Sequence, residues 1–191
     1  MQELISSTLI VALAEMGDKT QLLALLLAAR FKKPIPIIAA ILVSTLINHA
    51  LSAVFGQWIT AMINPTWLVW VLSIGFIAMA IWMLIPDKLE DESENIKKWQ
   101  KFGVFGATFI LFTLAEIGDK TQLATVALAA KYDSIFWVTM GTTLGMLIAN
   151  VPAVLVGDRF AQRLPIALIH KIGACIFMAL GVMTLLGYYL L

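Results

Sequence analysis

Six apolar segments make up most of this chain, and each is long enough to cross a lipid bilayer as a helix. They hold about 19 to 27 residues each, and a helix needs roughly 20 to cross 30 Å of hydrocarbon. Because lipid offers no hydrogen bonds to an exposed backbone, we expect helices rather than strands. The six segments are Leu4–Ala29, Ile35–Trp58, Trp67–Ile85, Val104–Ala130, Ser134–Gly157 and Pro165–Leu190.

The composition supports a membrane protein and excludes several other classes. Only 13% of the residues are charged, about half the share found in soluble domains. A net charge of +1 gives no electrostatic footprint for nucleic acid. The single cysteine, Cys175, can form neither an internal disulfide nor a CxxC redox pair. We therefore expect an all-α polytopic protein whose surroundings are the lipid bilayer.

The chain contains an internal repeat with an offset of 101 residues. Leu13–Leu22 and Leu114–Leu123 are identical at nine of ten positions, and the same offset aligns His49 with Asn150. Each repeat holds three of the six segments, and an odd number makes the second copy enter the membrane from the opposite side. We predict two inverted three-helix repeats, residues 1–85 and 104–191, joined by an acidic linker at 86–103.

Positive charges in the loops indicate the orientation. Ten of the thirteen lysines and arginines follow the first, third and fifth segments, and only Lys131 lies on the opposite side. Since cytoplasmic loops are enriched in these residues, we expect both termini outside the cytoplasm. We interpret the polar run Pro86–Lys101 as a solvated cytoplasmic hinge. The ten are Arg30, Lys32, Lys33, Lys88, Lys97, Lys98, Lys101, Arg159, Arg163 and Lys171.

A charged motif lies in the middle of the first segment and again in the fourth. Glu15 and Glu116 fall within about two residues of the segment centres. Six unpaired charges there would cost on the order of 15–20 kcal/mol, so the charges must face one another or a wet cavity. On a continuous helix Glu15, Asp18 and Lys19 would share one face. Gly17 permits either close helix approach or a local break.

Bringing both motifs together would create an acidic cluster at the bilayer midplane. Four carboxylates and two ammoniums leave a net charge of −2, which one divalent cation would cancel. Carboxylate and amide oxygens suit Ca²⁺, Mg²⁺ or Mn²⁺. The candidate ligands are Glu15, Asp18, Glu116 and Asp119. The supporting residues are Gly17, Lys19, Thr20, Gln21, Gly118, Lys120, Thr121 and Gln122.

Polar residues in the second, fifth and sixth segments are secondary candidates. Asn48, His49 and Asn150 lie near the middle of their segments. His49 could bind a metal or carry protons, but an interhelical hydrogen bond is the commoner role for such residues. We expect His170, at the cytoplasmic end of the last segment, to reach out to the membrane interface.

The stretches EMGDKTQ and EIGDKTQ resemble the paired Glu-x-Gly-Asp-Lys-Thr signature of the manganese/calcium–proton exchangers of bacteria, chloroplasts and the Golgi. The resemblance spans nearly the whole chain and is greatest to bacterial manganese exporters of the MneA type. It implies export of Mn²⁺ or Ca²⁺ from the cytoplasm in exchange for protons, across a bacterial inner membrane. It implies no resident cofactor, and a homo-oligomer is compatible with the sequence without being required by it.

Other functions fit the sequence less well. A six-helix exporter of a small organic solute, such as an amino acid, is the main alternative, but matched carboxylates would repel the solute's own carboxylate. An intramembrane protease would need HExxH or a serine-centred constellation, and a thiol carrier would need two cysteines. A purely structural salt bridge is the remaining alternative, although apolar packing could replace it at little cost.

Overall fold

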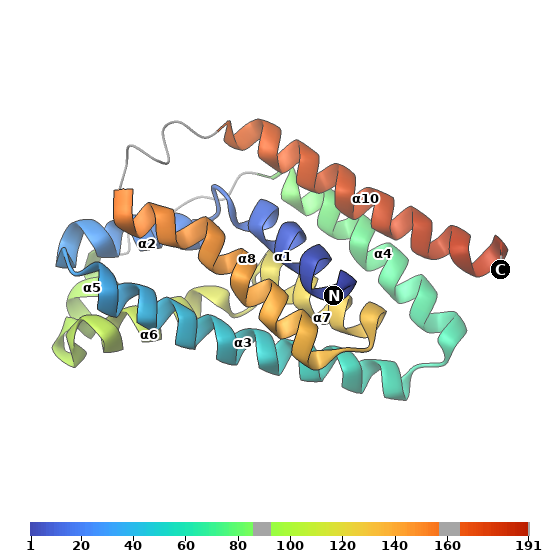
Figure 1. The fold of residues 1–191 in the computed structure, drawn as a ribbon, viewed down its shortest axis with the longest axis horizontal. Coiled ribbons are helices and arrows are strands. Elements are labelled where there is room, and N and C mark those ends of the chain that lie inside the picture. Colours follow the sequence, from blue (N-terminus) through green and yellow to red (C-terminus); the bar gives the residue numbers. More distant parts are fainter. Residues whose placement is uncertain (86–92, 157–164, 191) are drawn as a thin grey trace.

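The computed structural model describes residues 1–85, 93–156 and 165–190, and helices account for nearly all of them (Figure 1). No strand occurs among these residues, so the all-α prediction is confirmed. The helices are α1 (Gln2–Glu15), α2 (Lys19–Phe31), α3 (Pro34–Met62), α4 (Pro65–Met83), α5 (Ser93–Trp99), the 3₁₀ helix η1 (Gln100–Phe102), α6 (Gly103–Glu116), α7 (Lys120–Tyr132), α8 (Ile135–Val156) and α10 (Ile166–Leu190).

Several helices are long and apolar enough to cross a membrane. Four qualify singly within the described part of the chain, namely α3, α4, α8 and α10. A fifth span results if the helical stretch Glu94–Glu116 and α7, which meet at an angle of 67°, are counted together. Helices α1 and α2 are only 14 and 13 residues long. The chain is thus a multi-pass membrane protein with four or five candidate spans in the described residues.

Both charged motifs interrupt the helices that the sequence analysis treated as continuous. Gly17 has a φ of +83° and Gly118 a φ of +75°, a left-handed conformation that glycine adopts without steric cost. The aspartate after each glycine is extended and precedes the first residue of the next helix. The expectation that Glu15, Asp18 and Lys19 share one helix face is therefore wrong. Of the two roles considered for Gly17, the local break is the one found.

The two repeats are intertwined rather than side by side. Helix α1 packs along α8 and α6 along α3, so each broken helix contacts the long second helix of the other repeat (Figure 1). Gly145 lets α1 come close, because a Cβ there would lie 2.6 Å from the carbonyl oxygen of Thr8. At the equivalent position in the first repeat, Ser44 instead lies 2.9 Å from Thr113 of α6, oxygen to oxygen.

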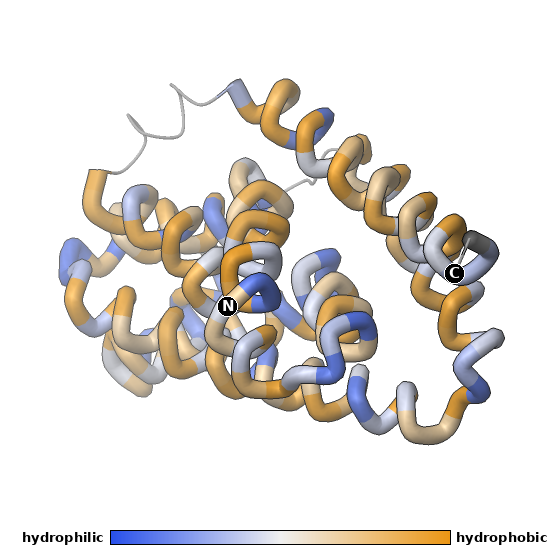
Figure 2. The backbone as a smooth tube through the Cα atoms, turned by 45° about the vertical axis from the view of Figure 1, so that its right-hand side comes forward, coloured by the Kyte–Doolittle hydropathy of each residue, from blue (hydrophilic) through white to orange (hydrophobic). Residues whose placement is uncertain are grey.

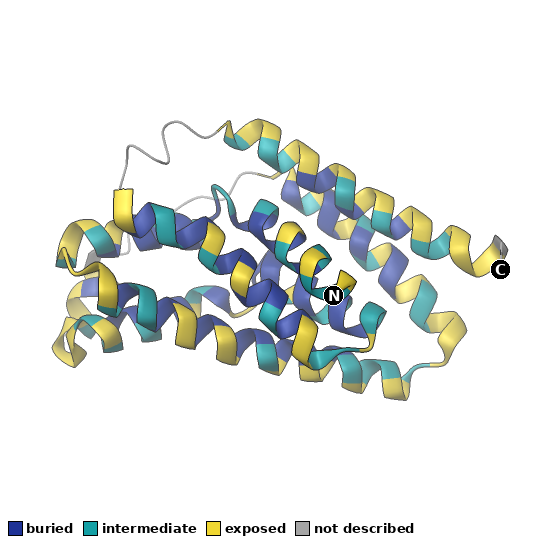
Figure 3. Cartoon of the chain, in the orientation of Figure 1, coloured by how far each residue is buried: buried dark blue, intermediate teal, exposed yellow. Residues whose placement is uncertain are grey.

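Apolar residues cover the outside of the molecule, as expected of a protein surrounded by lipid. Hydrophobic residues run along most of each helix (Figure 2), and the exposed faces point away from the neighbouring helices (Figure 3). Leu51, Ile74 and Met183 are examples of exposed side chains on α3, α4 and α10. Helices α4 and α10 pair with each other, and α4 also packs on α7 while α10 packs on α1.

Part of the segment interpreted as a solvated hinge is helical and packed. Residues 86–92 lie outside the described residues, but α5 and η1 follow them. Ile96 of α5 is only 4% exposed and belongs to the apolar cluster that includes Leu23, Leu27 and Phe112. The second half of the segment is thus helical and anchored through Ile96, while most of its other residues are exposed, as the prediction of a solvated segment requires.

Candidate metal centre

The two helix breaks are stabilised by the same hydrogen bonds. The backbone N–H of Gly17 donates to Oε1 of Gln21 at 2.9 Å, and that of Gly118 donates to Oε1 of Gln122 at 2.7 Å. Each glutamine thus satisfies a donor that the interrupted helix leaves free. Gln21 also donates from Nε2 to the carbonyl oxygen of Ala149 at 2.8 Å. The side chains of Gln21 and Gln122 therefore stabilise the backbone conformation at the two breaks.

The two motifs meet through crossed ion pairs. Nζ of Lys19 lies 3.1 Å from Oδ1 of Asp119, and Nζ of Lys120 lies 3.4 Å from Oδ1 of Asp18. Each lysine thus reaches the aspartate of the other motif, across about one hundred residues of sequence. The two pairs differ in burial, since the Lys19 side chain is 34% exposed and the Lys120 side chain only 3%.

Three carboxylates from the two motifs form one buried group. Oxygen atoms of Glu15, Asp18 and Asp119 all lie within 4.8 Å of one another. Two ligands that each lie about 2.0–2.6 Å from one ion are at most about 5 Å apart. The spacing of this three-carboxylate group therefore suits a single hard divalent cation.

Glu116 lies beside the three-carboxylate group and has different neighbours. The hydroxyl of Thr121 lies 3.3 Å from Oε2 of Glu116 and 3.4 Å from Oδ2 of Asp119, so it connects the two carboxylates. Nε2 of His49 lies 3.7 Å from the same Oε2 of Glu116. His49 and Glu116 are both fully buried.

The second long helix of each repeat presents a polar residue to the glutamate of the other repeat. In α8, Nδ2 of Asn150 donates to Oε1 of Glu15 at 3.3 Å and to the carbonyl oxygen of Met146 at 3.1 Å. In α3, His49 occupies the equivalent position and faces Glu116. Two residues that were secondary candidates in the sequence therefore lie against the acidic residues of the motifs.

Two other sequence candidates have no such contact. Asn48 and Thr20 are buried, but neither Nδ2 of Asn48 nor the hydroxyl of Thr20 has a hydrogen-bond partner among the described residues. Thr20 differs in this from its repeat counterpart Thr121. The two motifs are thus alike in backbone conformation but not in every side-chain contact.

The first helix break is covered by α10, which the sequence analysis did not anticipate. Nε2 of His170 lies 2.8 Å from the carbonyl oxygen of Met16, which can only accept a hydrogen bond. The side chain of Ile166 lies directly against Gly17. The half-buried ring of His170 therefore contacts the backbone of the first helix break, whereas its expected position at the membrane interface stays a prediction.

No helix among the described residues packs against Gly118 of the second break in the way that α10 packs against Gly17. Ile117 is 61% exposed, and nothing in the described part of the chain lies within 4 Å of the position that a Cβ on Gly118 would take. Helix α10 thus covers the backbone of the first break, whereas the backbone of the second break is exposed.

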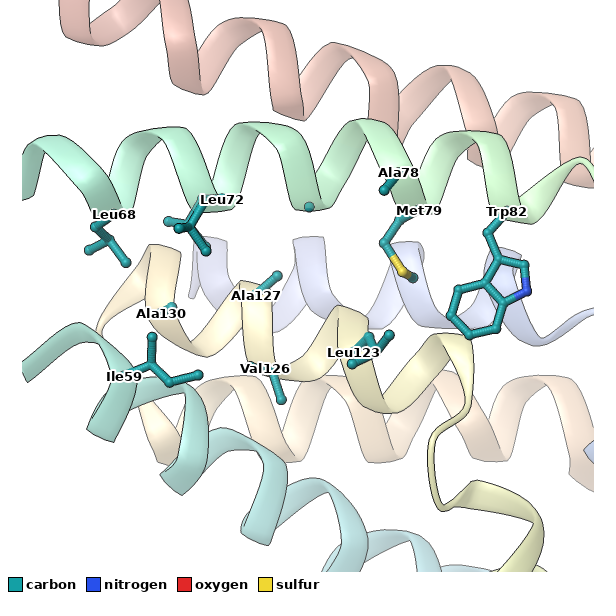
Figure 4. A pocket seen from close by; sticks show the side chains of 12 residues that line it. Ile59, Leu68, Leu72, Ala78, Met79, Trp82, Leu123, Val126, Ala127 and Ala130 are labelled. Atoms are coloured by element: carbon teal, nitrogen blue, oxygen red, sulfur yellow. The ribbon is translucent and has the colours of Figure 1, made fainter. Parts of the chain in front are cut away.

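An apolar cavity of about 280 Å³ lies between α3, α4 and α7, separate from the acidic residues. Figure 4 shows Leu72, Met79 and Trp82 of α4 facing α7 across it. Every side chain that lines it is apolar or, for Trp82, mainly so. Since a divalent cation needs oxygen or nitrogen ligands, this cavity is not an ion site.

Comparison with known proteins agrees with this geometry. The profile of the family described as "Divalent cation/proton antiporter GDT1" matches residues 3–91 and 104–190. A Vibrio cholerae protein that bears the name "Putative manganese exporter" is 52% identical over 185 residues, which cover 96% of this chain and 90% of the relative.

More distant relatives come from cyanobacteria and plants. A GDT1-like protein of Synechocystis is 27% identical, covering 92% of this chain and 93% of the relative. GDT1-like protein 3 of Oryza sativa subsp. indica is 28% identical, covering 94% and 72%. No solved structure matches the chain. The chain therefore belongs to the GDT1 family of divalent cation/proton antiporters.

Proposed function

We propose that this protein exports Mn²⁺ from the cytoplasm in exchange for protons, through a site that both motifs build. The observation that carries the proposal is the grouping of Glu15, Asp18 and Asp119 within 4.8 Å, buried at the junction of the repeats. Buried ionisable groups at membrane depth are costly and are typical of transport sites. Glu116 completes the set of four acidic residues at this site.

Manganese is the proposed cargo because of the relative's name, and the ligand chemistry is compatible with it. The Vibrio cholerae relative with 52% identity bears the name "Putative manganese exporter". Carboxylate oxygens bind Mn²⁺ and Ca²⁺ alike, so Ca²⁺ is the second candidate. A small organic solute stays the alternative from another class, but three clustered carboxylates favour a cation over an amino acid.

We further propose six spans in two inverted repeats, with both termini outside the cytoplasm. Helices α1 and α2 would form the first span and α6 and α7 the fourth, each broken at its motif. The equal φ signs at Gly17 and Gly118 and the crossed lysine–aspartate pairs support a pseudo-twofold relation. The end of α2 and helix α5 lie at the same end of the molecule (Figure 1), as expected if Arg30, Lys97 and Lys98 face the cytoplasm.

Exchange follows if the ion and protons occupy the same carboxylates in turn. A bare cluster with a net charge of −2 cannot move through a low-dielectric barrier without a large cost. Binding of one divalent cation neutralises it, and so does protonation of two carboxylates. The carrier can therefore change its exposed side in the loaded or the protonated form, but not when it is empty and charged.

Ion flux in proteoliposomes tests the proposal. The full chain is reconstituted, a pH gradient is imposed, and uptake of Mn²⁺, Ca²⁺ and Mg²⁺ is measured together with proton movement. We expect Mn²⁺ uptake that depends on the gradient and protons that move in the opposite direction. Absence of flux for every divalent ion, or Mn²⁺ flux with no movement of protons, would contradict the proposed exchange.

A further inference from the structure

His49 is a buried polar side chain whose ring nitrogens have no hydrogen bond. Its side chain is fully buried in α3, and neither Nδ1 nor Nε2 has a hydrogen-bond partner among the described residues. A buried polar group without a partner is destabilising. An imidazole in this state is available to a ligand.

The ring points at a carboxylate that belongs to the candidate site. Nε2 of His49 is 3.7 Å from Oε2 of Glu116, a separation within the roughly 3 to 5 Å expected of two ligands on one ion. The hydroxyl of Thr121 is 3.3 Å from the same oxygen and links it to Asp119. The space between His49 and Glu116 is thus next to the three-carboxylate group.

The equivalent residue in the other repeat shares this state only in part, because Oδ1 of Asn150 has no hydrogen-bond partner among the described residues whereas its amide nitrogen has. Asn150 donates hydrogen bonds to Glu15 and to the backbone of Met146. The pseudo-symmetry of the site is therefore broken at this position, where the first repeat supplies an imidazole and the second an amide.

Imidazole and carboxamide groups differ in the metals that they bind best. Imidazole nitrogen is a ligand for transition metals, whereas Ca²⁺ takes almost only oxygen. A site with carboxylates alone binds Ca²⁺ and Mn²⁺ by similar chemistry. A site that adds one nitrogen binds the transition metal better.

We propose that His49 and Glu116 form a second cation position beside the three-carboxylate group, and that His49 is the residue that makes the protein prefer Mn²⁺ over Ca²⁺. This inference rests on the proposed function and names the determinant of its selectivity. The hydroxyl of Thr121 contacts Glu116 of one position and Asp119 of the other, so an ion that moves between the two positions would move past this hydroxyl.

Electron paramagnetic resonance on bound Mn²⁺ tests the ligand directly. The chain has only two histidines, so in His170→Asn any imidazole signal must come from His49. We expect the ¹⁴N coupling of a directly bound imidazole in the wild type and in His170→Asn at saturating Mn²⁺, and its loss in His49→Asn. Mn²⁺ binding without that coupling in His170→Asn would overturn the inference but leave the proposed function standing. This outcome needs no change at His49, so it does not depend on how His49→Asn folds.

Transport selectivity gives a second, independent readout. His49→Asn installs the residue that the second repeat carries at Asn150. Since loss of even an indirect ligand partner lowers metal affinity about 10–100-fold, we expect the apparent Mn²⁺ affinity to fall at least about tenfold. The apparent Ca²⁺ affinity should change much less. Equal changes for both ions would indicate a structural role for His49 and would overturn the inference, whereas absence of any pH-driven divalent flux in the wild type would instead refute the proposed function.

Discussion

Nζ of Lys19 lies 3.1 Å from Oδ1 of Asp119, so the ammonium of the first motif neutralises a carboxylate of the second. The reciprocal pair joins Lys120 and Asp18 at 3.4 Å. The two pairs occupy equivalent positions in the repeats but different environments, because Lys120 is buried and Lys19 is one-third exposed. Equivalent substitutions in the two motifs should therefore have unequal effects.

Lys120→Gln should destabilise the protein more than Lys19→Gln. Removing one partner of a buried ion pair costs about 3–5 kcal/mol, whereas solvent screens a partly exposed pair and reduces its contribution. Thermal unfolding of the purified protein in detergent, read by tryptophan fluorescence, measures the difference. If Lys19→Gln lowered the unfolding temperature more than Lys120→Gln, burial would not determine how much each ion pair contributes to stability.

The four acidic residues should each be essential for transport. We expect Glu15→Gln, Asp18→Asn, Glu116→Gln and Asp119→Asn to lower Mn²⁺ flux by at least about tenfold, by analogy with the loss of metal-site residues. The amides keep the size and one oxygen of each side chain but lose the charge and the titratable proton. Flux is measured in proteoliposomes at equal amounts of inserted protein.

Glu3→Gln is the matched control for this series. Glu3 lies on the same helix as Glu15 but at its exposed end, where it pairs with the N-terminal ammonium at 2.8 Å. We expect it to transport normally. Near-normal flux in two or more of the four site variants would refute the four-carboxylate site.

Alanine at Gly17 should be more harmful than alanine at Gly118. Both glycines have a positive φ, which costs a residue with a Cβ about 1–2 kcal/mol. Only at Gly17 would the new Cβ also collide with Ile166 of α10. Unfolding temperature and Mn²⁺ flux of the two variants are compared.

Two further variants separate strain from collision. Ile166→Ala in the Gly17→Ala background should recover part of the loss, because it removes the colliding side chain. Gly75→Ala should be close to neutral, since Gly75 lies within α4 and has nothing within 4 Å of a Cβ. If the Gly17→Ala and Gly118→Ala variants lost stability and flux equally, the contact between Gly17 and α10 would not contribute to either.

The meeting of the two motifs could be predicted from the sequence, but the way the chain arranges them could not. The cost of six isolated charges in hydrocarbon required Asp18 and Asp119 to find partners, and the repeat supplied them. The sequence left a break at Gly17 as one of two possibilities and could not decide between them, because one glycine disfavours a helix by only about 1 kcal/mol. The contacts between Lys19 and Asp119 and between His170 and Met16 each span 100 or more residues, so no local sequence pattern indicates them.

The sequence also did not predict that one glutamate would join the three-carboxylate group and the other would not. Glu15 and Glu116 occupy identical positions in the repeats, yet only Glu15 belongs to the three-carboxylate group. The neighbours that distinguish the two glutamates are Asn150 of α8 and His49 of α3. Both lie on other helices, far from the glutamates in the sequence. The role of Ile96 was missed because one apolar residue in a polar run gives no periodic signal.

The termini should both be outside the cytoplasm. Single cysteines at position 2 and in the segment 93–99, each in a Cys175→Ser background, can be labelled in intact cells with an impermeant thiol reagent. We expect the first to react and the second to react only after permeabilisation, because the basic loops favour the cytoplasmic side. Labelling of the 93–99 position in intact cells, or protection of position 2, would reverse the orientation.

Exchange should be close to electroneutral, with about two protons for each divalent cation. Four carboxylates and two lysines carry a net charge of −2, which one M²⁺ neutralises on the way out. Two protons restore neutrality on the return, when a bare charge would have to cross a low-dielectric barrier. Mn²⁺ uptake into proteoliposomes should therefore respond strongly to a pH gradient at zero voltage. It should respond weakly to a potassium-diffusion potential at equal pH on both sides. If voltage alone drives uptake as well as the pH gradient does, charge moves with the ion, and an exchanger of another stoichiometry or a uniporter would replace this scheme.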